Sequence, residues 1–398
     1  MEERNEINEI NGSEICAESE IITECGGGEK QKVTLLGVLK KYVPSFSVIF
    51  FVMCILAGVV HITCLISSGF ADWYNQTLGA AVRALLCYIT MYLPFSLAET
   101  IIIGLPVIVI LLIVICVKSL NKSDVAATRC IVGLFSVLTF MYSVFVLGYG
   151  MGYHGAPLTE KLGLEDKAVT AEELEATAYA LLEDMQPYLS SIAYGKGGES
   201  YMPYSLNELN DKLNDAYAVA AEKYDFIQKL RSNIKYIVLS EPMTYTHISG
   251  VYSYYTGEAN LNINFPDYTL PFTAAHELAH QRGIAPENEA NFVAFLVCLE
   301  SDDEYIRYSA YLNMFEYVTN ALYSASAEKY YDVMARTDTR AQYEMIAYSR
   351  FFDKYRESVA SEVSDVVNDT YLKTQGQTAG SKSYGMVVDL AVAYYKQK

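Results

Sequence analysis

The segment HELAH, His276 to His280, holds the side chains whose types and spacing best fit a chemical site in this 398-residue chain. Residues four apart lie on one face of a helix, so the rings of His276 and His280 can reach one zinc ion. Glu277 lies about 100 degrees round the helix from His276. From there its carboxylate can act as general base toward a water that the metal activates. With five histidines in the whole chain, an accidental His-Glu-x-x-His is rare, and we interpret the motif as functional.

A zinc site that works on substrate needs a third protein ligand and one open position. No histidine follows His280, so the candidates downstream are carboxylates, and the nearest are Glu287 and Glu289. We favour Glu287, because Asn291 lies four residues further on, on the same face of the next expected helix. Its amide can accept the free ring N–H of a ligand histidine and orient that ring. Glu289 stays open as the alternative ligand.

The residues around HELAH predict the elements that position it. In NLNINF, residues 260–265, polar and apolar side chains alternate, which is typical of a strand at a sheet edge. Such a strand could align an extended substrate by β-addition. Thr273 is the expected N-cap of the HELAH helix, Gly283 ends it, and a second helix is expected from Pro286 to about Glu300. Thr-x-x-Glu and Ser-x-x-Glu capping boxes at residues 170–173 and 205–208 predict further helices.

Three long apolar runs precede this part of the chain. Residues 43–66, 100–117 and 130–150 contain no charged residue, and about 20 apolar residues suffice for a membrane-spanning helix. Residues 78–95 are apolar but include Arg83, so we expect an interfacial segment packed on the membrane helices. Glu99, at the start of the second run, is expected either to pair with Arg83 or to extend to the membrane surface.

Charge and composition exclude two classes of protein. The chain has 29 basic and 47 acidic residues, a net charge of −18, and 52% apolar residues. A nucleic-acid binder would need the opposite charge, and a wholly disordered acidic chain would lack the apolar content. Lysines and arginines before the first run and between the last two predict a cytoplasmic N-terminus. Residues 152–398 are then expected on the extracytoplasmic side of the membrane.

We therefore expect three parts. Residues 1–42 form an acidic, disordered cytoplasmic tail, and residues 43–151 form a membrane domain with three spans. Residues 152–398 form a mainly α (α+β) domain with a small sheet beside the HExxH helix. This last part contains one cysteine, Cys298, so it can have no internal disulfide.

The stretch from TGEANLNINF through HELAHQRG to ENEANF resembles an uncharacterised family of bacterial membrane proteins, known as a domain of unknown function, that look like membrane-anchored zincins. The ENEAN block is also similar to the Glu-x-x-Ala-Asp/Asn helix of gluzincin-type zinc metallopeptidases. That resemblance implies Glu287 as a zinc ligand and Asn291 as its orienting neighbour. The link from His280 to Glu287 is shorter than in most gluzincins. Tyr384, in the C-terminal SKSYG block, is the candidate donor of a hydrogen bond to the transition state.

These expectations combine into a membrane-anchored zinc metallohydrolase, a peptidase acting on peptide or protein, embedded in the lipid bilayer and not binding nucleic acid. The alternative from another class is a sensor or interaction domain at the cell surface that binds zinc without catalysis or binds no metal. The presence of Glu277 favours the enzyme, because a purely structural metal site needs no base.

Overall fold

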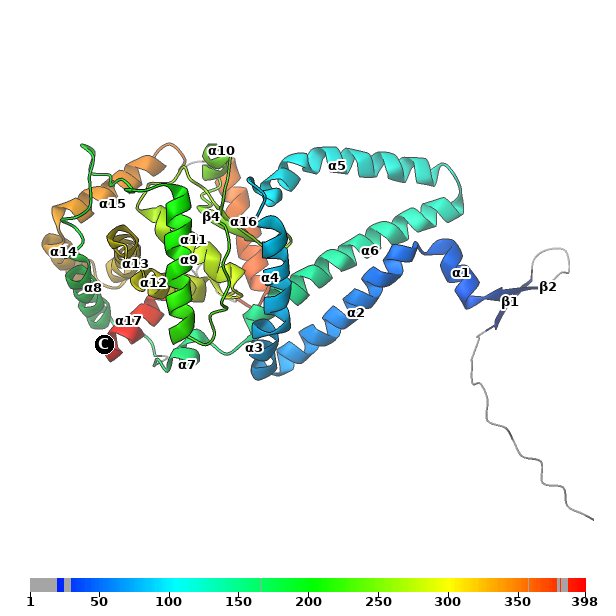
Figure 1. Cartoon of the computed structure of the whole chain (residues 1–398), viewed down its shortest axis with the longest axis horizontal. Coiled ribbons are helices and arrows are strands. Elements are labelled where there is room, and N and C mark those ends of the chain that lie inside the picture. The colour runs from blue at the N-terminus through cyan, green and yellow to red at the C-terminus, as the bar shows by residue number, and fades with distance from the viewer. Residues whose placement is uncertain (1–19, 25–29, 166, 357, 378–379, 381–385) are drawn as a thin grey trace, which may run out of the picture. The chain divides into compact units, whose positions relative to one another are not determined.

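The computed structural model describes residues 20–24, 30–165, 167–356, 358–377, 380 and 386–398 (Figure 1). This part of the chain is mainly helical, with a three-stranded sheet and a separate two-stranded hairpin. It divides into two compact units. The first takes the chain up to Met53 together with Val107–Phe140, and the second takes Cys54–Pro106 together with Met141–Lys398.

Three helices are long and apolar enough to cross a membrane: α2 (Ser45–Ile66), α5 (Leu97–Leu120) and α6 (Asp124–Gly148). Their positions agree with the three predicted runs, although α5 and α6 each begin earlier. No residue of α5 is buried, which suits a helix whose apolar side chains face lipid. The chain therefore has the helices of a membrane protein.

The described residues before the first span form a hairpin and a helix, whereas the disordered tail predicted for residues 1–42 falls largely on residues outside the description and stays a prediction. Strand β1 (Glu20–Glu24) pairs antiparallel with β2 (Lys30–Thr34), and α1 (Leu35–Tyr42) follows. The hydroxyl of Thr34 caps α1 by accepting the N–H of Gly37. Both strands contain β-branched residues, which favour strands. The prediction for this segment had considered its acidic composition and not this preference. Residues 1–19 and 25–29 lie outside the described residues.

The sheet of the second unit has the order β3-β5-β4, with β3 (Lys235–Tyr236) parallel and β4 (Gly250–Ser253) antiparallel to β5 (Glu258–Leu261). The prediction that residues 260–265 form an edge strand is wrong. Strand β5 is central, ends at Leu261 and is buried throughout, and the edge strand beside the HELAH helix is β4.

Internal hydrogen bonds explain why the polar residues of that segment do not face water. The side chain of Asn260 accepts from the hydroxyl of Ser96 (2.6 Å) and donates to the carbonyl of Val251 (3.1 Å). The amide of Asn262 donates to the carbonyl of Ile248 (3.0 Å). An alternating pattern predicts only that two faces differ, and here both faces are covered.

Helices enclose the core of the second unit. The HELAH helix, α11 (Thr269–Gln281), packs against α12 (Glu287–Leu299) and α13 (Glu304–Ala325). Helix α11 starts before Thr273, so the predicted N-cap is wrong, and Pro271 occupies the first turn, where its missing N–H is not needed.

The remaining helices are α3 (Ser68–Gln76), α4 (Leu78–Thr90), η1 (Gly150–His154), α7 (Leu158–Leu162), α8 (Ala171–Met185), α9 (Leu206–Lys223), α10 (Ser240–Thr244), α14 (Ala327–Arg336), α15 (Thr339–Phe352), α16 (Val359–Thr374) and α17 (Val387–Gln397). Both predicted capping boxes form, at the starts of α8 and α9.

Arg83 of α4 joins the end of a span to the end of the HELAH helix. Its side chain is 1% exposed and donates to the carbonyls of Gly148 (3.1 Å), Asn75 (2.7 Å) and Arg282 (3.4 Å). Gly148 ends α6 and Arg282 is the C-cap of α11. A helix end carries partial negative charge, which offsets the buried guanidinium. The partner of Arg83 is thus not Glu99.

Two carboxylates hold the start of α5 to the sheet. Glu258 of β5 accepts the backbone N–H groups of Leu97 (3.0 Å) and Ala98 (2.9 Å). Glu99 accepts the backbone N–H groups of residues 238 and 239, directly after β3. The domain therefore contacts both the start of α5 and the end of α6.

Candidate metal centre

The side chains of His276, His280 and Glu287 converge on one point. Atom Oε2 of Glu287 lies 3.2 Å from Nε2 of His276 and 3.3 Å from Nε2 of His280. All three side chains are buried, and their ligand atoms lie within 4.8 Å of one another. Two ligands at tetrahedral angles about zinc, each bonded at roughly 2.0–2.1 Å, stand about 3.3 Å apart. The two nitrogen–oxygen distances fit that spacing.

A short turn brings the third ligand to the other two. Helix α11 ends where Gly283 takes a φ of 91°, a conformation that favours glycine, and Pro286 precedes α12. Glu287 is the first residue of α12, so its side chain returns toward the last turns of α11. The seven-residue step from His280 to Glu287 is thus long enough to close the group.

The same turn orients His280. Its Nδ1 lies 2.7 Å from the carbonyl oxygen of Ile284 and 3.0 Å from the hydroxyl of Tyr149. A carbonyl only accepts, so Nδ1 carries a proton, and Nε2, which faces Glu287, is the ring nitrogen that could bind a metal. Such hydrogen bonds fix the tautomer and the ring orientation of metal-ligating histidines.

The unsatisfied atoms of the group support the presence of a cation. Oε2 of Glu287 is buried beside two ring nitrogens but has no hydrogen-bond partner among the described residues. Lone pairs directed at one point, rather than at donors, are what a metal ion would satisfy. These donors therefore fit a metal ion such as zinc.

Asn291 lies near His276 but does not make the hydrogen bond that was predicted to orient a ligand histidine. It borders the same cavity as His276, the pKa of which is lowered by burial. However, neither Nδ1 of His276 nor Nδ2 of Asn291 has a hydrogen-bond partner within the described part of the chain. In this structure the orienting contacts are made to the other ring, that of His280.

Burial and mutual charge set the electrostatics of the metal-free group. Burial raises the pKa of the Glu277 carboxyl to about 8. Burial opposes the charge of His280, but the Glu287 carboxylate outweighs it and brings the pKa of His280 to about 9. For Glu287, burial is outweighed by the two histidines, which hold its pKa well below the usual value. Without a metal the group is thus a buried ion pair between a protonated His280 and the Glu287 carboxylate.

Glu277 projects from α11 toward the edge strand. A Cβ atom at Gly250 of β4 would lie 2.6 Å from Oε1 of Glu277, so the strand can approach the carboxylate only because residue 250 is glycine. Oε2 of Glu277 has no hydrogen-bond partner among the described residues. The carboxylate is therefore free to exchange a proton with a group in the adjoining space.

Two cavities meet at His276 and Glu277. The aromatic cavity, of about 330 Å³, is lined by the whole metal group and by Tyr149, Tyr153, Ile248, Gly250, Val251, Tyr252, Tyr254, Ser364, Val367, Asn368 and Tyr371. The polar cavity, of about 350 Å³, is lined by Thr246, His247, Ile248, Ser249, Gly250, Phe265, Thr269, Phe272, Thr273, Asn291, Asn313, Tyr317, Tyr348, Ser364, Asp365 and Asn368 in addition to His276 and Glu277. His276 and Glu277 are thus accessible from both cavities, and His280 and Glu287 from the aromatic cavity.

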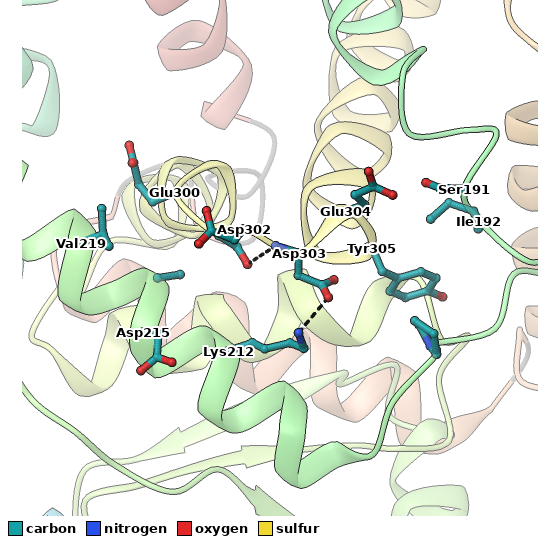
Figure 2. A pocket seen from close by; sticks show the side chains of 13 residues that line it. Ser191, Ile192, Lys212, Asp215, Val219, Glu300, Asp302, Asp303, Glu304 and Tyr305 are labelled. Atoms are coloured by element: carbon teal, nitrogen blue, oxygen red, sulfur yellow. Dashed lines mark hydrogen bonds and ion pairs between the residues drawn. The ribbon is translucent and has the colours of Figure 1, made fainter.

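Another cavity, of about 490 Å³, lies where α12 ends and α13 begins. Figure 2 shows its acidic side chains around Lys212, which pairs with Asp303 at 3.1 Å. The backbone N–H of Asp303 also donates to the hydroxyl of Ser301. No member of the metal group lines this cavity, so it is separate from the site.

The remaining predicted site residues lie elsewhere. Oε1 of Glu289 accepts the backbone N–H of Leu158 at 2.8 Å, and Glu289 does not belong to the metal group. Tyr384 lies outside the described residues. The sequence reasoning missed Tyr149 and Gly250. Tyr149 stands 131 residues before His280, and no spacing rule relates them.

None of the curated proteins and none of the solved structures matches this chain. Residues 74–392 do match a protein family, over a region that includes Arg83, two of the three candidate spans and the metal group. The chain belongs to the family described as "Protein of unknown function (DUF3810)".

Proposed function

We propose that this protein is a membrane-anchored, zinc-dependent metallohydrolase that cleaves peptide bonds. The observation that carries the proposal is the spacing of Glu287 Oε2 from the two histidine nitrogens, 3.2 and 3.3 Å, with a buried Glu277 beside it. Two imidazoles and one carboxylate form a ligand set of catalytic zinc sites, which keep a fourth position open. When bound, zinc would lower the pKa of a water molecule and polarise a carbonyl group.

Glu277 supplies the acid–base chemistry. As the water oxygen bonds to the carbonyl carbon of the substrate, the water proton moves to Glu277. The proton then passes to the amide nitrogen as the carbon–nitrogen bond breaks, which leaves a carboxylic acid and an amine. The acid then gives up the second proton of the water, and the amine takes up a proton. General acid–base catalysis needs a group within reach of the proton that it takes, and the position of Glu277 on the same helix as the two histidines, with Oε2 unpaired among the described residues, supports this role.

Strand β4 supports the choice of a peptide as substrate. Within the described sheet β4 pairs only with β5, so its other edge can bind an extended chain through backbone hydrogen bonds. Gly250 lies at its start, against Glu277, and Val251 and Tyr252 continue along the aromatic cavity. A peptide added to β4 would pass the metal group. The lysines and arginines around the spans favour a site outside the cytoplasm.

The test uses the full chain in lipid nanodiscs, because a fragment starting at residue 152 would lack Tyr149 and Arg83. We expect about one zinc per wild-type chain, retained in Glu289→Gln and lost in Glu287→Gln and His276→Ala. Glu277→Gln should retain zinc and cleave a degenerate library of internally quenched peptides at least about 100-fold more slowly than wild type.

Two outcomes would contradict the proposal. Equal zinc loss in Glu287→Gln and Glu289→Gln would show that the metal group is wrong. Full zinc content without cleavage of any peptide in the library would instead favour the non-catalytic sensor or interaction domain.

A further inference from the structure

We propose that the substrates are polypeptides cleaved beside their membrane anchor, with the apolar, anchored side of the cleavage site held in the aromatic cavity. This inference rests on the proposed peptidase function and names its substrate class. It follows from three observations: the difference between the two cavities, the contact of one of them with a span, and an exposed apolar stripe at its rim.

The two cavities share His276 and Glu277 but differ in the chemistry of their other lining residues. Around the aromatic cavity, the charged residues among those described are the site carboxylates Glu277 and Glu287, and the histidines can carry charge only when protonated. Two of its hydroxyls, those of Tyr153 and Tyr371, bond to each other at 3.3 Å. The rings thus offer their apolar faces.

The polar cavity suits a different part of a substrate. Its lining includes the amides of Asn291 and Asn313, the hydroxyl of Thr273 and the carboxylate of Asp365. Such groups bind the backbone and polar side chains of a hydrated chain. A substrate spanning both cavities would therefore be apolar on one side of the cleaved bond and polar on the other.

The aromatic cavity is continuous with the end of a span. Tyr149 directly follows α6, and Phe145, inside α6, contacts the rings of Tyr254 (centroids 5.0 Å apart) and Tyr371 (6.3 Å). With 25 residues, α6 is about 37 Å long, against roughly 30 Å for the apolar core of a bilayer. Its end, and the cavity in contact with it, therefore lie at the membrane surface.

Helix α16 provides the rim and carries a stripe of exposed valines beside the exposed carboxylates of Glu362 and Asp365. Tyr371 of α16 contacts the end of α6, near which α16 is drawn in Figure 1. Val359, Val363, Val366 and Val367 recur at helical spacing and are 77%, 57%, 67% and 62% exposed. Because this stripe adjoins the end of a span, its occupant is the lipid bilayer, as for an interfacial helix. Val367 belongs to both the stripe and the cavity.

A matched pair of substitutions on α16 separates recognition in the cavity from mere attraction to the membrane. Val367→Asp places a charge at the cavity, whereas Val363→Asp places the same charge on the same stripe but outside the cavity lining. Both residues are more than half exposed, so neither change should unfold the domain. Zinc content and thermal unfolding of both variants serve as checks.

The probe is the internally quenched peptide library, made without an acyl group and with one palmitoyl group at either end. Full-length wild type in nanodiscs should show a kcat/KM at least about tenfold higher for one acylated form, as expected for burial of a few methylene groups. Val367→Asp should remove most of that preference, and Val363→Asp should keep it.

The possible results are distinct. Equal cleavage of acylated and plain peptides would overturn the inference while the peptidase function stands. Equal loss of preference in both variants would also overturn it, because the membrane surface rather than the cavity would then be responsible. If no peptide is cleaved although zinc is bound, the proposed function fails and the inference fails with it.

Discussion

Tyr149→Phe tests whether the segment that follows the last span helps to hold the metal. The change removes only the hydroxyl that lies 3.0 Å from Nδ1 of His280, and the ring keeps its stacking on Tyr254 (5.6 Å, 9° between planes). Loss of a hydrogen bond behind a metal ligand typically weakens metal binding about 10- to 100-fold. The carbonyl of Ile284 still accepts from Nδ1 at 2.7 Å, so we expect the lower limit, about tenfold or 1.4 kcal/mol.

The assay is competition for zinc between a chelator of known affinity and the full chain in nanodiscs. Tyr252→Phe is the matched control, because its ring also contacts Tyr149 (centroids 5.3 Å apart) and its buried hydroxyl has no hydrogen-bond partner among the described residues. Zinc affinity should fall in Tyr149→Phe and stay within about twofold of wild type in Tyr252→Phe. If the two variants bind zinc equally well, the carbonyl of Ile284 alone orients His280 and the reasoning is refuted.

Two further predictions concern stability. Arg83→Met should lower the free energy of unfolding by about 3 kcal/mol, since three backbone carbonyls lose a buried donor while the cost of burying the charge is recovered. Arg231→Met is the control, because Arg231 is exposed and makes only surface ion pairs, and it should lower the free energy of unfolding by less than about 1 kcal/mol. Denaturant titrations measure both values, and equal losses of stability in the two variants would contradict the role of Arg83. Burial raises the pKa of Glu316, which accepts from Tyr268 at 3.0 Å, from 4.5 to about 7. The folded state then binds more protons than the unfolded state between these values, so stability should fall as pH rises from 4.5 to 7. Glu316→Gln should remove this part of the dependence, and unchanged pH profiles would argue against it.

Much of the fold could be predicted where the signal is local. The three spans follow from uninterrupted apolar runs, and the capping boxes before α8 and α9 follow from four-residue patterns. The errors arose where distant parts of the chain decide. The segment 260–265 looked half exposed, but β4 and the region around Ser96 cover it. Polar and apolar residues do alternate in this segment, but its burial depends on segments that are distant in the sequence.

The site shows the same division. By itself the sequence determined that His276 and His280 share a helix face and that a glycine turn returns the chain to them within a few residues. It left Glu287 and Glu289 open, since both begin one helix. Only the tertiary structure separated them, by turning Glu289 toward the backbone of Leu158. Only the tertiary structure, too, brought Tyr149 to His280. Such contacts come from packing between segments more than a hundred residues apart, which no local spacing records.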